Sequence, residues 1–235
     1  MGLVDKQELR ERAWAALREA GTARFPGVEG RIPNFVGAEA AADRLADTLE
    51  WKAASTLKCN PDSPQLPVRK RALEEGKVVY MAVPKLANPE PFWRLDPEEL
   101  SVGPYRAASI KGASRDGRPV SLEEMTVIDI LVCGPVAVER GGARLGKGGG
   151  YSDLEFAIAT EAGLIGDDTV IATTIHPAQI FEDGTIPLTE HDFPLDLIVT
   201  PEETIRTETI LARPGGIVEH HLDPLKREEI PVLRR

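Results

Sequence analysis

The stretch RLGKGGGYSD at residues 144–153 lies between an apolar run typical of a strand and a run typical of a helix. Glycine has no side chain, so such a loop lets a ligand approach the backbone and lets the amide N–H groups turn towards it. A helix predicted over Ser152–Ala162 directs its positive dipole end to the same point, and Arg144 and Lys147 add charge. The loop therefore has the parts of a phosphate-binding site, although a flexible surface loop is an equally good interpretation. Its glycines are Gly146, Gly148, Gly149 and Gly150.

Two well-known phosphate loops do not match this stretch. The triplet Gly-Lys-Ser/Thr of the Walker A loop does not occur. The spacing Gly146-x-Gly148-x-Gly150 also differs from the G-x-G-x-x-G of dinucleotide-binding folds, and it comes late in the chain.

The apolar run before the loop predicts the centre of a sheet. Residues Val127–Val132 (VIDILV) are apolar on both faces except at Asp129, as is usual for a central parallel strand. Short apolar strands alternate with helices along the chain, which predicts a mainly parallel α/β sheet. Loops are expected at 24–36 and 61–67, and a loop with short elements is expected at 88–125. The other predicted strands are 53–59, 77–83, 168–174 and 195–199, and the other predicted helices are 5–19, 38–49 and 68–75.

Composition restricts the class of protein. A chain of 235 residues is expected to form a single domain. The net charge of −10 disfavours a nucleic-acid binder but leaves room for a local basic pocket. The charged N-terminus and the lack of a long apolar run predict a cytoplasmic protein with no membrane partner. Cys59 and Cys133 are interpreted as two buried thiols, with a disulfide as the alternative.

Three motifs, in the same order and spacing, resemble those of the 5-formyltetrahydrofolate cyclo-ligase (methenyltetrahydrofolate synthetase) family. The fairly specific one is Arg-Leu-Gly-x-Gly-x-Gly-Tyr-x-Asp after an apolar strand. Residues 187–200 (PLTEHDFPLDLIVT) resemble the family's C-terminal acidic motif and last strand. Lys6 and Arg10 resemble its N-terminal basic pair. The resemblance covers most of residues 1–206 and leaves a C-terminal tail from about residue 207.

The resemblance implies an ATP- and Mg-dependent enzyme with a three-layer Rossmann-like fold, whose sheet looks like that of sugar-phosphate isomerases. The family phosphorylates the formyl oxygen of 5-formyltetrahydrofolate. A neighbouring nitrogen then closes the ring and phosphate leaves, which gives 5,10-methenyltetrahydrofolate. The expected partners are therefore ATP and a small-molecule substrate, in a monomer or a small homo-oligomer.

Each residue that the resemblance singles out also has a plainer interpretation. Lys6 and Arg10 are helix neighbours and, from sequence alone, lie on a solvated face. Arg144 could pair with Glu139, and Asp153 could cap its helix. The resemblance instead makes Asp153 and Asp192 ligands of Mg²⁺, Arg144 and Tyr151 catalytic, and Asp62 and Tyr151 substrate-binding. It assigns nucleotide binding to Lys6, Arg10, Arg144, Gly146, Lys147, Gly148, Gly149, Gly150, Tyr151 and Ser152.

The departures from the family pattern fall mainly on the folate side. Asp62 replaces a glutamate, Gln65 replaces a threonine, and Ser152 replaces a second tyrosine. Gly149 stands where the family usually has a basic residue. Two alternatives therefore stay open: a paralogue that binds ATP but acts on a non-folate, for example thiamin-related, substrate, and a non-enzymatic binding module.

Overall fold

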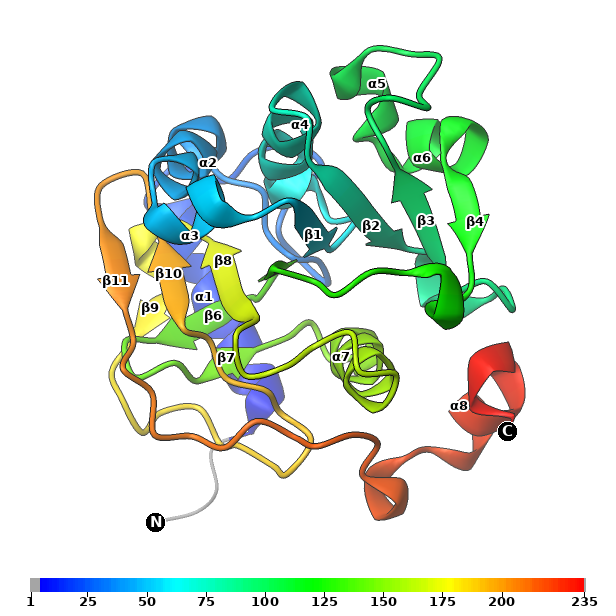
Figure 1. Ribbon diagram of the computed structural model, residues 1–235. Coiled ribbons are helices and arrows are strands. Elements are labelled where there is room, and N and C mark those ends of the chain that lie inside the picture. Colours follow the sequence, from blue (N-terminus) through cyan, green and yellow to red (C-terminus); the bar gives the residue numbers. More distant parts are fainter. Residues whose placement is uncertain (1–4, 235) are drawn as a thin grey trace.

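The computed structural model describes residues 5–234, and its centre is a sheet of eight strands (Figure 1). The strand order is β11-β10-β8-β5-β1-β2-β3-β4. The five strands from β10 to β2 are parallel, and β3, β4 and β11 add to the edges in antiparallel fashion. The bounds are β1 Thr56–Cys59, β2 Val78–Ala82, β3 Phe92–Leu95, β4 Arg118–Val120, β5 Ile130–Cys133, β8 Val170–Thr174, β10 Leu197–Val199 and β11 Thr204–Arg206.

The order of the parallel strands predicts where a ligand would bind. The chain passes from β1 to β2 on one side and then returns to β5 on the other side, so the winding direction changes between β1 and β5. In open α/β sheets, ligands bind at the carboxyl ends of the two strands at such a point. The strand predicted from VIDILV is confirmed as central: β5 is fully buried and pairs in parallel with both β1 and β8.

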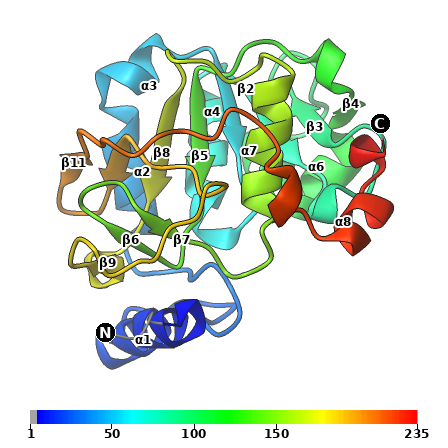
Figure 2. The same cartoon turned by 90° about the horizontal axis from the view of Figure 1, so that it is seen from below.

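Helices cover both faces of the sheet, which confirms the three-layer α/β prediction (Figures 1 and 2). One face carries α2 and α4, whose apolar residues share a cluster with alternate residues of the parallel strands. The other face carries α7, where Phe156 and Ile158 pack against the remaining alternate residues. The bounds are α2 Ala38–Ala46, α3 Leu49–Ala53, α4 Leu66–Glu74 and α7 Tyr151–Glu161.

The helix predicted over residues 38–49 is in fact two helices. Thr48 lies between them, and its hydroxyl donates to the carbonyl of Leu45 at 2.7 Å. The same hydroxyl accepts from the backbone N–H of Trp51 at 3.2 Å and so caps α3. Threonine at this position therefore ends one helix and begins the next.

A second, small sheet packs against the N-terminal helix and leads directly into the glycine-rich loop. The hairpin of β6 (Ala137–Glu139) and β7 (Arg144–Leu145) pairs with β9 (Ile180–Phe181). The predicted first helix is confirmed as α1 (Lys6–Glu19), capped by Asp5. Its buried residues Leu9, Ala13 and Leu17 share an apolar cluster with Ala137 and Leu145.

The region expected at 88–125 as loop with short elements contains short strands and helices. Besides β3 and β4 it holds the helices α5 (Pro104–Ala107) and α6 (Ile110–Asp116). These elements are short, and Pro119 lies in the edge strand β4, so their pattern is too weak to predict from sequence.

The segment of residues 207–234, named here the C-terminal segment, packs on the α7 side of the sheet (Figure 2). It contains α8 (Pro224–Glu229). Ile230 and Leu233 are buried in the same cluster as Phe156. Within residues 5–234 no helix is long and apolar enough to span a membrane.

Candidate active site

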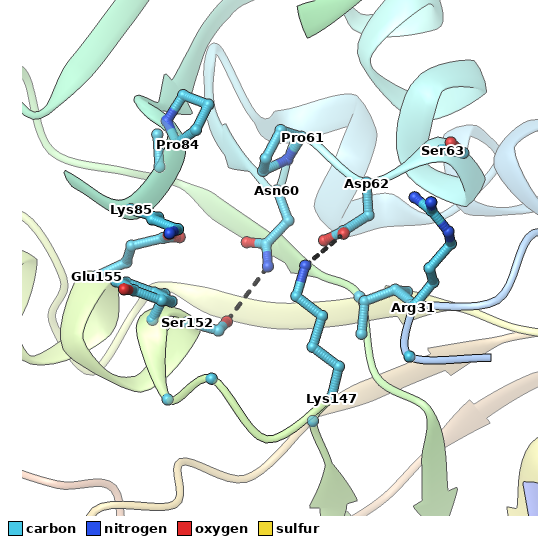
Figure 3. A pocket seen from close by; sticks show the side chains of 18 of the residues that line it. Arg31, Asn60, Pro61, Asp62, Ser63, Pro84, Lys85, Lys147, Ser152 and Glu155 are labelled. Carbon is cyan, nitrogen blue, oxygen red and sulfur yellow. Dashed lines mark hydrogen bonds and ion pairs between the residues drawn. The ribbon is translucent and has the colours of Figure 1, made fainter. Parts of the chain in front are cut away.

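A cavity of about 590 Å³ opens at the carboxyl ends of β1 and β5. Residues 60–63 after β1 form one wall, and residues 83–85 after β2 form the next. The glycine-rich loop and the first residues of α7 close the opposite side (Figure 3). The cavity therefore lies where the strand order predicts a ligand, and the loop singled out from sequence forms part of it.

Two glycines of the loop are required by their surroundings. Gly148 has φ +101° and Gly150 has φ +66°, in the left-handed region that favours glycine. A Cβ on Gly148 would lie 3.3 Å from the guanidinium carbon of Arg10, and one on Gly150 would lie 2.9 Å from Nζ of Lys226. The positive φ therefore favours glycine at both positions, and the cationic ends of two flexible side chains lie against the loop.

Helix α1 brings its basic pair to the site rather than to solvent. Lys6 Nζ donates to Asp192 Oδ2 at 2.9 Å, and Arg10 Nε donates to the carbonyl of Gly146 at 2.8 Å. Burial lowers the pKa of Arg10, although Asp5 and Asp192 oppose this shift. These two contacts link the three motifs, which are far apart in the sequence, into one site.

Arg144 is buried and tightly held. Its Nε donates to the carbonyl of Phe193 at 2.9 Å, and its guanidinium lies 3.5 Å from the centre of the Phe193 ring. It pairs with Asp153. Burial opposes the charge, but Asp153, Cys133 and Asp192 together outweigh burial and raise the pKa of Arg144. The alternative partner Glu139 is wrong, because that carboxylate accepts the backbone N–H groups of residues 184 and 186.

Each of the two predicted metal ligands pairs with a cation, Asp153 with Arg144 and Asp192 with Lys6. Within residues 5–234 no group of three or more His, Cys, Asp and Glu side chains is arranged to hold a metal ion. Mg²⁺ needs only one or two carboxylates when phosphate oxygens and water supply the rest. Asp153 lines the cavity beside Gly149 and Gly150, where a phosphate would lie. Hydrogen bonds from Lys6 and Thr189 outweigh burial and lower the pKa of Asp192, so this carboxylate is charged at neutral pH.

The remaining predicted residues line the cavity. Lys147 Nζ lies 3.4 Å from Asp62 Oδ1, across the cavity mouth (Figure 3). Ser152 Oγ accepts from the amide of Asn60 at 3.3 Å. Tyr151 is half-buried and also lines the wall. Asp62 therefore faces a common space with most of the predicted loop residues, whereas Lys6, Arg10, Gly148 and Asp192 do not line this cavity.

Sequence reasoning missed a buried ion pair at the wall of this cavity. Lys58, on β1, is 1% exposed and donates to Asn60 Oδ1 at 2.6 Å. It also pairs with Glu155 on α7, which lines the cavity. The available signal was a lysine between the apolar residues Leu57 and Cys59 of a predicted strand. A buried lysine needs a carboxylate partner, and α7 supplies it.

The loop after β1 is held rigidly by one arginine. Arg69, on α4, is 1% exposed. Its guanidinium donates to the carbonyls of Asn60, Pro61 and Asp62, the last two at 3.2 and 3.1 Å. These contacts fix the cavity wall that carries Asp62, because all three carbonyls have one common donor.

Comparison with known proteins agrees with the fold and the motifs. A sequence model of the 5-formyltetrahydrofolate cyclo-ligase family matches residues 3–201. The chain belongs to this family. Cyclo-ligase-family relatives include a methenyltetrahydrofolate synthase domain-containing protein of Bos taurus, 33% identical over 98% of this chain, and one of Mus musculus, 34% identical over 98%. The chain spans 61% and 63% of the length of these two relatives.

A solved structure of the cyclo-ligase family has the same fold. The 5,10-methenyltetrahydrofolate synthetase of Aquifex aeolicus is 21% identical, with a TM-score of 0.55 over 92% of this chain and 99% of that chain. All three motifs lie within the matched residues 3–201, and the C-terminal segment lies outside them.

Proposed function

We propose that this protein is a 5-formyltetrahydrofolate cyclo-ligase that uses Mg-ATP to form 5,10-methenyltetrahydrofolate. The observation that carries the proposal is the glycine-rich loop, because it faces a cavity of about 590 Å³ with Arg144 and Lys147 on the same wall. A loop of this kind at the N-terminus of α7 binds phosphate through its backbone N–H groups. The cavity is large enough for a second substrate beside the phosphates.

The reaction requires charge stabilisation more than it requires an acid or a base. The formyl oxygen attacks the γ-phosphorus of ATP and ADP leaves; a neighbouring N–H nitrogen then attacks the formyl carbon, and phosphate leaves together with the proton of that nitrogen. The guanidinium groups of Arg10 and Arg144 neutralise the oxygens of the transferred phosphoryl group. The cavity walls hold the two substrates side by side, which removes much of the entropic cost of their encounter. Mg²⁺, held by Asp153 and Asp192 with phosphate oxygens, would neutralise further charge.

A spectrophotometric assay for the methenyl product with ATP and Mg²⁺ tests the proposal. The wild-type protein is expected to form product, and Arg10→Met and Lys147→Met are each expected to lower kcat/KM about 10- to 100-fold through loss of charge-assisted contacts. Lys52→Met is the control, because Lys52 is an exposed cation on α3 that donates to the carbonyl of Asp47. Absence of product at high enzyme concentration would contradict the proposal.

A second candidate is an ATP-using enzyme of this family with a non-folate substrate. The ion pair of Lys147 with Asp62 favours this candidate, because the resemblance assigns folate binding to the carboxylate of Asp62 and Lys147 already occupies that carboxylate. Melting temperatures separate the two candidates, since a ligand stabilises the folded state in proportion to its binding. A shift with Mg-ATP but none with 5-formyltetrahydrofolate supports the second candidate. No shift with Mg-ATP supports a non-enzymatic module.

A further inference from the structure

The C-terminal segment places a cation on the glycine-rich loop. Lys226, on α8, donates from Nζ to the carbonyl of Gly149 at 2.5 Å. The same ammonium lies 5.1 Å from the centre of the Tyr151 ring. Arg10, from the other end of the chain, donates to the carbonyl of Gly146 in the same loop. Two cations that are remote in sequence therefore hold the loop at two of its carbonyls.

The position of Lys226 is fixed by the packing of the segment. Arg213 pairs with Asp196 at 2.7 Å, and the backbone N–H of Ile217 donates to Glu161 on α7 at 2.8 Å. Ile230, directly after α8, is 1% exposed. The segment is thus attached before and after α8, so Lys226 reaches the loop from a fixed base.

A second cavity, of about 220 Å³, lies between the loop, α7 and the C-terminal segment. Lys226 lines it together with Gly148, Gly150 and Asp153. Gly150 and Asp153 also line the main cavity, so the loop backbone is exposed to ligand-sized space on two sides. An anion on the loop would lie within the range of Lys226.

Lys226 differs from three other cations of the site in its partner. Lys6, Arg144 and Lys147 each pair with a carboxylate within 4.0 Å. Among residues 5–234, Lys226 has no ion pair of this kind, and its observed partner is a neutral carbonyl. A half-buried ammonium beside a phosphate loop gains more from a phosphate oxygen than from a neutral carbonyl, because charge-assisted hydrogen bonds are about twice as strong.

We propose that Lys226 binds a phosphate oxygen of the nucleotide at the glycine-rich loop, so that the C-terminal segment forms part of the nucleotide site. The inference rests on the use of ATP in the proposed function. It extends the site beyond residues 3–201, the part of the chain that matches the family. On binding, the ammonium exchanges the carbonyl of Gly149 for the phosphate oxygen, and that carbonyl is released towards solvent.

Lys226→Met tests this inference, with Arg227→Met as the matched control. Arg227 is the next residue of α8 and carries the same charge, but it pairs with Glu219 and is 43% exposed. Titration calorimetry of the full chain with Mg-ATP, inorganic tripolyphosphate and adenosine gives the affinities. Lys226→Met is expected to raise the Kd of Mg-ATP and of tripolyphosphate about 10-fold or more, while Lys226→Arg restores most of the affinity. Arg227→Met is expected to change either Kd less than about 2-fold, and adenosine should not distinguish the variants.

The outcomes separate this inference from the proposed function. Product formation with an unchanged Kd and KM for ATP in Lys226→Met overturns the inference alone. A Lys226-dependent affinity for tripolyphosphate in a protein that forms no methenyl product supports the inference and contradicts the proposed function. Equal losses in Lys226→Met and Arg227→Met show a general charge effect and overturn the inference, as does a wild-type protein that binds neither anion. Melting temperatures without ligand, equal to that of the wild type, show that the variants are folded.

Discussion

The buried positive charge of Lys58 is balanced by the carboxylate of Glu155. Both Lys58 and Glu155 are less than 10% exposed, and removing one partner of such a pair leaves a buried charge. Glu155→Gln is therefore expected to lower the free energy of unfolding by about 3–5 kcal/mol, measured by urea denaturation at pH 7. Glu74→Gln is the control, because Glu74 and Lys70 are each 43% exposed and such pairs contribute about 0–1 kcal/mol.

The double variant Lys58→Met/Glu155→Leu distinguishes charge from packing. Replacing a buried ion pair by apolar side chains of similar size is often neutral. We expect the double variant to regain most of the stability that Glu155→Gln loses. If the double variant is as unstable as the single one, the loss comes from packing around α7 and not from the uncompensated ammonium.

The two cysteine thiols are expected to be inert in the folded protein. Cys59 and Cys133 are free and buried, which confirms the interpretation from sequence. Burial raises the pKa of Cys133 to about 11 and also raises the pKa of Cys59, so neither forms the reactive thiolate at pH 8. A thiol reagent such as dithionitrobenzoate should titrate no thiol in the native protein and both after unfolding in urea. Reaction of one thiol without unfolding would contradict this burial.

The residues of the site divide into those that sequence can identify and those that only the fold brings together. Gly148 and Gly150 lie close together in the sequence, and each adopts a backbone conformation that favours glycine. The glycine pattern of the loop is therefore visible in the sequence. Lys58 and Glu155 are 97 positions apart, and no local periodicity joins them. A buried pair of this kind is found only when the sheet places β1 beside α7.

At the scale of elements, an ion pair ties the edge strand β11 to α3. The Arg206 guanidinium donates to Glu50, and this hydrogen bond lowers the pKa of Glu50 below 4.5 against the effect of burial. Because the folded pKa is below the unfolded one, the pair stabilises the protein above about pH 4.5 and loses this effect as pH falls through the folded pKa.

Glu50→Gln measures this contribution. Arg206 is 55% exposed, so the loss at pH 7 is expected to stay below about 1 kcal/mol. The difference from the wild type should shrink as the pH is lowered from 7 towards 3, because the pair loses its effect as pH falls through the folded pKa of Glu50. Urea denaturation at the two pH values checks this; a difference that does not shrink at all would indicate that the glutamine disturbs packing.

The elements that sequence predicts well are those with an uninterrupted pattern. α1 has apolar periodicity with a clear beginning and end, α7 is bounded by Gly150 and Gly163, and β5 is a continuous apolar run. β3 and β4 escape prediction because they are short strands with antiparallel pairing, β4 being the edge strand, and their residues include Arg94 and Pro119. Pairing partners, which the sequence does not display, decide the structure there.

For the whole molecule, the structure adds most to the sequence at the C-terminal segment, whose order the sequence leaves open. Its sequence is polar from Arg213 onward, with no helical or strand periodicity, so it predicts a tail. Its few apolar residues nevertheless reach the cluster around α7, among them Ile217, Leu222, Ile230 and Leu233. These residues are not spaced with the period of a helix or a strand, because their positions follow the surface that they cover. The sequence alone therefore does not indicate that they are buried.

Ile230→Ala tests whether the C-terminal segment belongs to the cooperative unit. Ile230 is 1% exposed, and truncating such a side chain costs about 2–5 kcal/mol when the segment unfolds together with the sheet. Leu225→Ala is the control, because Leu225, on α8, is 64% exposed and its loss should change stability by less than about 0.5 kcal/mol. The expected result is one urea transition, shifted to lower concentration in Ile230→Ala only. A wild-type midpoint for Ile230→Ala would show that the segment detaches independently. In that case Lys226 would have no fixed base from which to reach a phosphate.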